Sequence, residues 1–310
     1  MRVVAALGGN ALSPSGGTGS VEEMRSQLVA TGTALAALVA SGVSLVLTHG
    51  NGPQVGRILL QQELAAGEVP PMPMDVCGAE SQGQLGYLLA QALDNALRTA
   101  KVQARVLCLV TQVVVDGRDP AFRRPTKPVG PSYDRQEAQR IAHESGHVFA
   151  IQPGGSWRRV VASPLPVRIV EEAPLRALAD AGHVVVAAGG GGVPVVEHRG
   201  RLRGVEAVVD KDRTAALLAR AVGADRLMIL TEVPQVQVGF GTPAARALSS
   251  LTVSEARRLL AAGEFPSGSM GPKVEACADF VAGGGTAVIA ALSDAAAAAR
   301  GEAGTAVVPG

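Results

Sequence analysis

Residues 43–56 read VSLVLTHGNGPQVG, and this stretch indicates the class of fold. Its first five residues form a short apolar run, which is typical of a strand buried on both faces. The run leads into His-Gly-Asn-Gly, where glycine lets a ligand approach the backbone closely. Pro53 suits the first turn of a helix, because the N–H that it lacks would have no partner there. The stretch therefore predicts a strand, a glycine turn and a helix.

The same pattern recurs along the chain. Five more apolar, valine-rich runs lie at residues 3–7, 104–110, 183–188, 226–230 and 286–292. Helical spacing of apolar residues is found at 21–40, 78–97, 212–223 and 254–263, and Ser254 is the predicted N-cap of the last helix. Since apolar strands alternate with helices, the sequence predicts a doubly wound α/β fold with a parallel sheet. Residues 116–165, rich in Pro, Arg and Gly, are predicted to leave this sheet as an insertion.

Glycine turns follow three of the predicted strands. They read Gly8-Gly9-Asn10, His-Gly-Asn-Gly at 49–52 and four glycines at 189–192. Successive backbone N–H groups between a strand and a helix can bind an anion. Because the carboxyl ends of parallel strands meet at one sheet edge, we expect the three turns to converge on one anionic ligand.

Three lysines are candidates for neutralising that anion. Lys211 lies in VVDKD beside Asp210, Lys273 follows a Gly-Ser-Met-Gly-Pro loop, and Lys127 lies between prolines in PTKPVGP. Lys211 and Lys273 are at predicted helix starts, where a lysine opposes the helix dipole and gains from a bound anion.

Composition excludes several classes of function. The net charge is +1 and basic residues are not interleaved with aromatics, so we expect no nucleic-acid partner. No uncharged apolar run reaches the ~18–20 residues of a membrane span, and the first residues show no secretory leader pattern. Three scattered cysteines predict neither disulfides nor structural zinc. A cytoplasmic location, away from membranes, is the expectation.

Two other enzyme classes remain as alternatives. His143, Glu144 and His147 match the zinc motif H-E-x-x-H, but Gly146 is predicted to end the helix before the second histidine. No metal ligand is therefore assigned. GNGPQVG is one residue longer than the usual dinucleotide fingerprint and lacks the acidic residue for ribose, which leaves an NADPH-binding dehydrogenase as a weaker alternative.

Several stretches together identify a family. They are ALGGNAL (6–12), THGNGPQVG (48–56), MDVCGAESQGQLGY (74–87), PTKPVGPSY (125–133), GGGGVPV (189–195), GVEAVVDKD (204–212) and FPSGSMGPKVEA (265–276). In this order the chain resembles the carbamate kinases, a branch of the amino acid kinase family. Ala6 replaces a lysine that many other branches carry, which similarly favours this branch.

The resemblance implies an open αβα sandwich with a mostly parallel sheet. It implies a carbamate-binding lobe (1–205), a protruding subdomain inserted at 117–165, and a nucleotide-binding lobe (206–310). The implied reaction is reversible phosphoryl transfer between MgATP and carbamate, giving ADP and carbamoyl phosphate. The resemblance further implies a homodimer that runs the reaction toward ATP in catabolism, within arginine metabolism.

The resemblance also implies roles for single residues. Carbamate attacks through an oxygen that is already anionic, so the site needs positioning and charge neutralisation rather than a general base. Catalytic roles fall to Lys127, Asp210, Lys211 and Lys273, with Asp210 ionised beside the lysines to orient them. Donors to carbamate and the phosphoryl group are Gly8, Gly9, Asn10, Gly50, Asn51 and Gly52. Nucleotide-binding residues are Lys211, Thr231, Met270, Gly271 and Lys273, with Mg²⁺ as the cofactor.

One stretch departs from the family pattern. After LMILT (227–231) the chain reads EVPQVQVGFGTP, with Pro234 and Gln237 where the family differs. This departure concerns the expected adenosine pocket. It supports the alternative of a non-catalytic nucleotide- or metabolite-binding relative with a regulatory role.

Overall fold

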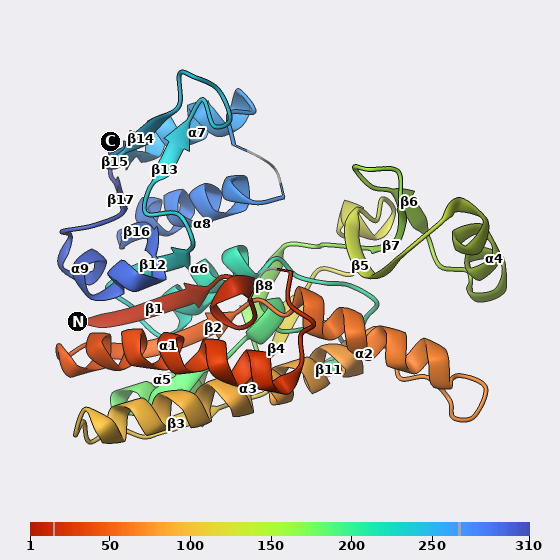
Figure 1. Cartoon of the computed structure of the whole chain (residues 1–310), viewed down its shortest axis with the longest axis horizontal. Coiled ribbons are helices and arrows are strands. Elements are labelled where there is room, and N and C mark those ends of the chain that lie inside the picture. The colour runs from red at the N-terminus through yellow and green to blue at the C-terminus, as the bar shows by residue number, and fades with distance from the viewer. Residues whose placement is uncertain (15, 266–267) are drawn as a thin grey trace.

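The computed structural model describes residues 1–14, 16–265 and 268–310 (Figure 1). The helices are α1 (Val21–Ala40), α2 (Gly52–Ala65), α3 (Met74–Thr99), α4 (Arg135–Ser145), α5 (Glu172–Asp180), α6 (Lys211–Ala221), α7 (Val253–Ala261), α8 (Met270–Ala282) and α9 (Ala295–Arg300). The strands are β1 (Arg2–Leu7), β2 (Ser44–His49), β3 (Val106–Cys108), β4 (Gln112–Val115), β5 (Lys127–Tyr133), β6 (Phe149–Ile151), β7 (Trp157–Val161), β8 (Pro166–Ile169), β9 (Val184–Val186), β10 (Val193–His198), β11 (Arg201–Gly204), β12 (Arg226–Thr231), β13 (Val236–Val238), β14 (Arg246–Leu248), β15 (Ser250–Thr252), β16 (Thr286–Ala291) and β17 (Thr305–Val308).

The central sheet of the described residues has the strand order β15-β17-β16-β12-β1-β2-β9-β3. Neighbouring strands are parallel except β16 and β17. All six predicted apolar runs lie in this sheet, so the prediction of a mostly parallel α/β fold is confirmed. The sequence analysis did not single out β15 and β17, which pair with each other and, through β17, with β16.

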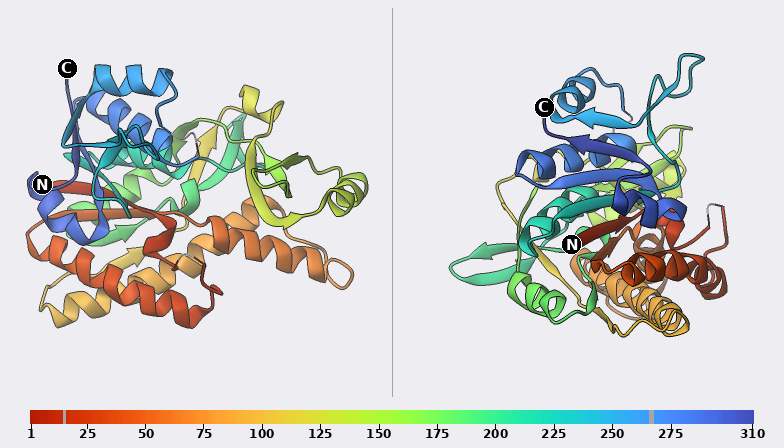
Figure 2. Two further views of the ribbon diagram at one scale, coloured as in Figure 1. Left: turned by 45° about the horizontal axis from the view of Figure 1, so that its top comes forward. Right: turned by 90° about the vertical axis from the view of Figure 1, so that its left-hand side faces the viewer.

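Both faces of the sheet are buried beneath helices (Figure 2). Side chains of β1 alternate between two cores: Val4 and Ala6 join one cluster, and Val3, Ala5 and Leu7 join the other. The first cluster includes residues of α5, α6 and α8, and the second includes residues of α1 and α3. This double burial is the reason that the strands read as continuous apolar runs.

The helix starts show where local sequence signals sufficed. Pro53 lies in the first turn of α2, as predicted, and the structure shows that Asn51 is the N-cap of this helix. The prediction that Ser254 caps α7 is wrong, because the N-cap is Thr252, whose side chain accepts a hydrogen bond from the backbone N–H of Glu255. The Glu255 carboxylate in turn accepts a hydrogen bond from the backbone N–H of Thr252 at 3.0 Å, and this capping box starts the helix two residues earlier than predicted. No helix in the described ranges combines the length and apolar character needed to cross a bilayer.

A separate small sheet projects from the molecule. Strands β4 and β8 pair antiparallel, and the chain between them forms the sheet β5-β7-β6 together with α4. Figures 1 and 2 show this part extending away from the central sheet, next to the C-terminal half of α2. Strand β1 of the expected first lobe pairs with β12 of the expected second lobe, so one sheet runs through both. The lobe boundary at 205/206 stays a prediction.

Candidate active site

The glycine turns converge as the sequence predicts. Strands β1, β2 and β9 are adjacent and parallel, so the turns that follow them lie at one sheet edge. A methyl group built on Gly50 would lie 3.4 Å from Cδ and Cε of Lys211 and 3.8 Å from the backbone nitrogen of Gly9. The side-chain stem of Lys211 therefore lies directly over the first two turns.

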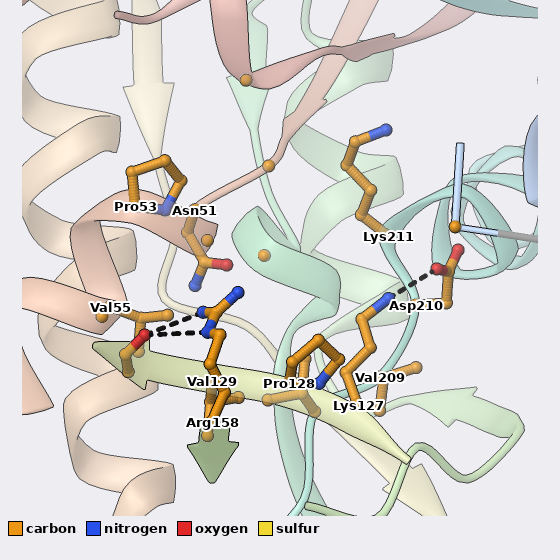
Figure 3. Close-up of a pocket in the computed structure, with 18 of the residues that line it drawn as sticks. Asn51, Pro53, Val55, Lys127, Pro128, Val129, Arg158, Val209, Asp210 and Lys211 are labelled. Atoms are coloured by element: carbon orange, nitrogen blue, oxygen red, sulfur yellow. Dashed lines mark hydrogen bonds and ion pairs between the residues drawn. The ribbon is translucent and has the colours of Figure 1, made fainter. Parts of the chain in front are cut away.

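Two cavities open at this edge, and they share three lining residues. The first has a volume of about 580 Å³ and is lined by the turn after β2, by Lys127 of the projecting sheet, and by residues 208–212 (Figure 3). The second, of about 430 Å³, is lined by Gly8, Asn10, Thr231 and residues 291–293 among others. Gly9, Lys211 and Lys273 line both cavities. A group bound at this junction would lie between two positive charges.

The three predicted lysines lie around two aspartates. Lys211 Nζ donates to one carboxylate oxygen of Asp212, and Lys273 Nζ donates to the other at 3.0 Å. Asp212 is only 4% exposed, and both lysine side chains are also largely buried. Burial lowers the pKa of Lys211, and Asp212 opposes this shift. A single buried carboxylate thus holds two ammonium groups beside each other at the cavity junction.

Asp212 was missed by sequence reasoning, which gave its role to Asp210. Asp210 is the N-cap of α6 and accepts backbone N–H groups from Asp212 and Arg213. Its other oxygen accepts from Lys127 Nζ at 3.1 Å. Burial acts to raise the pKa of the Asp210 carboxyl, but Lys127 and these N–H groups outweigh it and hold the pKa low. Asp210 therefore orients Lys127, while Asp212 orients the other two lysines.

The backbone donors need one correction. The Gly8 N–H donates to the carbonyl of Leu230 at 3.0 Å, and the Gly50 N–H donates to that of Leu7 at 3.1 Å. Because these N–H groups continue the sheet ladder, Gly8 and Gly50 are not available as donors to a ligand. The N–H groups of Gly9, Asn10, Asn51 and Gly52 have no hydrogen-bond partner among the described residues.

The glycines at 189–192 have a packing role that the sequence pattern did not reveal. A methyl group on Gly189 would lie 2.5 Å from the His49 ring, and one on Gly190 would lie 2.1 Å from the Asn51 amide. On Gly191 it would lie 2.1 Å from the carbonyl oxygen of Val209. Only Gly190 of these lines the first cavity. The turn chiefly lets β9 pack tightly beneath the other site residues.

Asn51 is fixed by this packing and by one further contact. Its side-chain nitrogen donates to Ser81 Oγ of α3 at 2.7 Å, and that hydroxyl donates to the carbonyl of Gly78. The amide is thereby held at the wall of the first cavity.

His49 lies just below the site and carries a pH prediction. Burial lowers the pKa of His49 to about 4, and Lys211 adds to the shift, while the hydrogen bond from Nδ1 to the Gly50 carbonyl opposes it. The folded state therefore disfavours the charged form relative to the unfolded state, whose histidine pKa is ~6.5. The contribution of His49 to the free energy of unfolding is complete above about pH 6.5 and is lost as the pH falls toward 4.

We expect His49 to cost the folded state ~2 kcal/mol of stability at pH 5 relative to pH 8. The measurement is the free energy of unfolding in urea at both pH values for the wild type and for His49→Asn. The asparagine variant should lose less stability on acidification, because it carries no group to protonate. Equal losses in the two proteins would show that His49 does not titrate on unfolding.

The predicted nucleotide residues are only partly brought together. Thr231 lines the second cavity together with Lys211 and Lys273. Asn10, predicted as a donor to the substrate, also lines this cavity, and its amide donates to the carboxylate of Glu232. Met270 and Gly271 form the start of α8 beside Lys273 but line neither cavity. Within the stretch 265–276, residues 266 and 267 lie outside the described residues.

The zinc alternative finds no support in the geometry. Helix α4 ends at Ser145, and Gly146 adopts φ 72°, so the predicted helix stop is confirmed. His147 therefore falls beyond the helix that carries His143. Across the described ranges, His, Cys, Asp and Glu side chains nowhere gather in a group of three that could hold a metal ion.

Comparisons with known proteins cover nearly the whole chain. The sequence profile of the amino acid kinase family matches residues 1–291. The carbamate kinase of Pyrococcus horikoshii is 47% identical over 313 residues, covering 99% of each chain. That of Trichomonas vaginalis is 44% identical over the full length of both. Carbamate kinase from Giardia lamblia bound to AMP-PNP superposes with a TM-score of 0.94 at 40% identity, covering 100% of this chain and 98% of that one.

Proposed function

Since the chain belongs to the amino acid kinase family and is a carbamate kinase within it, we propose that the phosphoryl group passes between carbamoyl phosphate and ADP at the junction of the two cavities. The carbamoyl group would occupy the first cavity, and the nucleotide phosphates would occupy the second. The observation that carries this proposal is that Gly9, Lys211 and Lys273 line both. The enzyme is an ATP-dependent phosphotransferase with a carboxyl-group acceptor, and the non-catalytic alternative is not favoured.

The reaction needs no general base in this site. In the direction of ATP, a terminal phosphate oxygen of ADP attacks the phosphorus of carbamoyl phosphate. The bond from phosphorus to the carbamoyl oxygen breaks, and carbamate leaves as a carboxylate that needs no proton. No histidine is found among the described residues lining the first cavity, which suits this chemistry. Catalysis then consists of alignment and charge neutralisation.

Each polar group at the junction has a proposed part in that task. Lys211 and Lys273 neutralise the transferring phosphoryl group, and Asp212 holds their ammonium groups side by side. Lys127 reaches the first cavity from the projecting sheet. The free N–H groups of the turns at 9–10 and 51–52 donate to the phosphoryl and carbamoyl oxygens. These donors are fixed before the substrate binds, which makes them effective in the transition state.

Magnesium fits this site as an ion carried by the nucleotide. Mg²⁺ usually binds through one or two carboxylates together with substrate phosphates, and it keeps several waters. Both oxygens of Asp212 are engaged by lysines, whereas Glu232 in the second cavity has Asn10 as its side-chain partner. Glu232 would therefore hold the ion, which supplies further charge neutralisation at the phosphates.

We expect ATP formation to depend on a divalent cation. Chelation by EDTA should abolish activity, and added Mg²⁺ should restore it. Glu232→Gln should raise the Mg²⁺ concentration for half-maximal rate several-fold, with Glu302→Gln, an exposed residue paired with Arg300, as the control. An unchanged Mg²⁺ requirement in the Glu232 variant would remove this residue from the metal site.

The wider setting is proposed from the family likeness. We propose a cytoplasmic homodimer that forms ATP from carbamoyl phosphate within arginine catabolism. Residues 1–205 would supply the carbamate lobe, with 117–165 as its protruding subdomain, and 206–310 the nucleotide lobe. Gln237 lies in β13, and Pro234 precedes this strand. The Val236 N–H of β13 donates to Thr305. An effect of this stretch on nucleotide choice stays a prediction.

The experiment that tests the proposal is luciferase-detected ATP formation from purified protein, ADP, Mg²⁺ and fresh carbamoyl phosphate. The purified chain should form ATP well above the non-enzymatic background. Calorimetric binding of ADP in the same preparation separates an inactive protein from a misfolded one. Binding of ADP without turnover would overturn the placement of catalysis at this junction.

A further inference from the structure

The projecting sheet brings a second cation into the first cavity. Arg158 of β7 lines this cavity together with Lys127 of β5 and Asn51, the N-cap of α2. In Figure 3 its guanidinium is directed toward Asn51. Neither the glycine and lysine motifs nor the charge pattern of the sequence singled out this residue.

One edge of the guanidinium is already occupied. Arg158 Nε and Nη2 both donate to the carbonyl oxygen of Gly130, at 3.2 and 2.8 Å. Gly130 adopts φ 69°, a conformation that favours glycine, within a register shift between β5 and β7. This local backbone geometry turns the carbonyl toward Arg158 and fixes the orientation of its side chain.

The other edge of the guanidinium is free. Among the described residues no carboxylate pairs with Arg158, whereas the adjacent Arg159 pairs with Glu206 outside this cavity. Arg158 Nη1 has no hydrogen-bond partner in the same residues, and one N–H of Nη2 remains. Burial lowers the pKa of the Arg158 guanidinium. Arginine nevertheless stays protonated in proteins, so the group is charged. An unpaired, half-buried fork of this kind matches a planar carboxylate.

We propose that the free Nη1/Nη2 edge of Arg158 binds the carboxylate of carbamate and the carbonyl oxygen of carbamoyl phosphate. The inference rests on the proposed placement of the carbamoyl group in the first cavity. Lys127 and Arg158 then divide the work of the projecting sheet: Lys127 serves the phosphoryl group and Arg158 the carbamoyl group. Because negative charge grows on the leaving carboxylate, this contact strengthens as the P–O bond breaks.

The test compares two competitive inhibitors of ATP formation. Phosphonoacetamide has the phosphonate and the carbonyl of the substrate, joined by a stable methylene group, and methylphosphonate lacks the carbonyl. Arg158→Lys keeps the charge but removes the fork. Loss of a charge-assisted bidentate contact should raise the inhibition constant of phosphonoacetamide by ~10- to 100-fold. The inhibition constant of methylphosphonate and the KM for ADP should stay unchanged.

Arg159→Lys is the matched control, because successive residues of a strand point to opposite faces. It should leave all three constants near the wild-type values, and thermal unfolding checks that both variants fold. Equal weakening of both inhibitors by Arg158→Lys would assign Arg158 to the phosphoryl group and overturn the proposal. No weakening of either would leave Arg158 only the task of supporting Gly130, which also overturns it. Wild-type ATP formation in the same assay tests the proposed function separately.

Discussion

Lys273→Ala is expected to lower the rate of ATP formation by on the order of 10²–10³ while the protein stays folded. The ammonium group lies at the junction of the two cavities and is held by Asp212 at 3.0 Å. Removing it leaves Lys211 as the one lysine at this junction, so part of the charge on the transferring phosphoryl group is no longer neutralised. The measurement is steady-state ATP formation at saturating ADP and carbamoyl phosphate, together with thermal unfolding.

The control for Lys273 uses the lysine that lies outside the site. The chain contains four lysines, at positions 101, 127, 211 and 273, and Lys101 is exposed with φ 58°. Lys101→Asn removes one positive charge with a residue that tolerates this backbone conformation, and should leave the rate unchanged. A Lys273 variant that keeps more than a tenth of the wild-type rate would contradict its assignment to the transition state.

Asp212→Asn is expected to lower both activity and stability. In the wild type the Asp212 carboxylate accepts hydrogen bonds from both Lys211 and Lys273. The neutral asparagine amide cannot neutralise their positive charges. Leaving buried charges without their partner typically costs ~3–5 kcal/mol, and part of this is relieved if a lysine loses its proton. We expect a rate loss of on the order of 10² or more and a lower free energy of unfolding at pH 8.

The pH profile distinguishes this role from general structural damage. Asp212 raises the pKa of Lys211 against the effect of burial, so its removal lowers the pH at which that ammonium group deprotonates. The alkaline limb of the activity profile should therefore move to lower pH in Asp212→Asn. Asp116→Asn, an exposed residue paired with Arg118, should change neither limb. An unshifted alkaline limb in the Asp212 variant would show that Asp212 does not govern the lysine charges.

The strands of the central sheet and the sheet edge that carries the candidate site could be predicted from the amino-acid sequence alone. Strands buried on both faces must be apolar along their whole length, so the six runs could be recognised without neighbours. The glycine turns and the lysines at helix starts follow from local backbone chemistry, and parallel strand order brings them to one edge. The short β15 and β17 carry no such signal, because the pairing with β16 and with each other defines them.

Which hydrogen bonds the polar groups form depends on tertiary contacts. Gly8 and Gly50 look like ligand donors in sequence, but neighbouring strands take their N–H groups. Asp212 is adjacent to Lys211, yet its bond to Lys273 joins residues 61 apart, and Arg158 is aimed by a carbonyl of a different strand. A residue type fixes which hydrogen bonds are possible. Which of them form depends on the groups that the fold brings within about 3 Å, and this information is not local in the sequence.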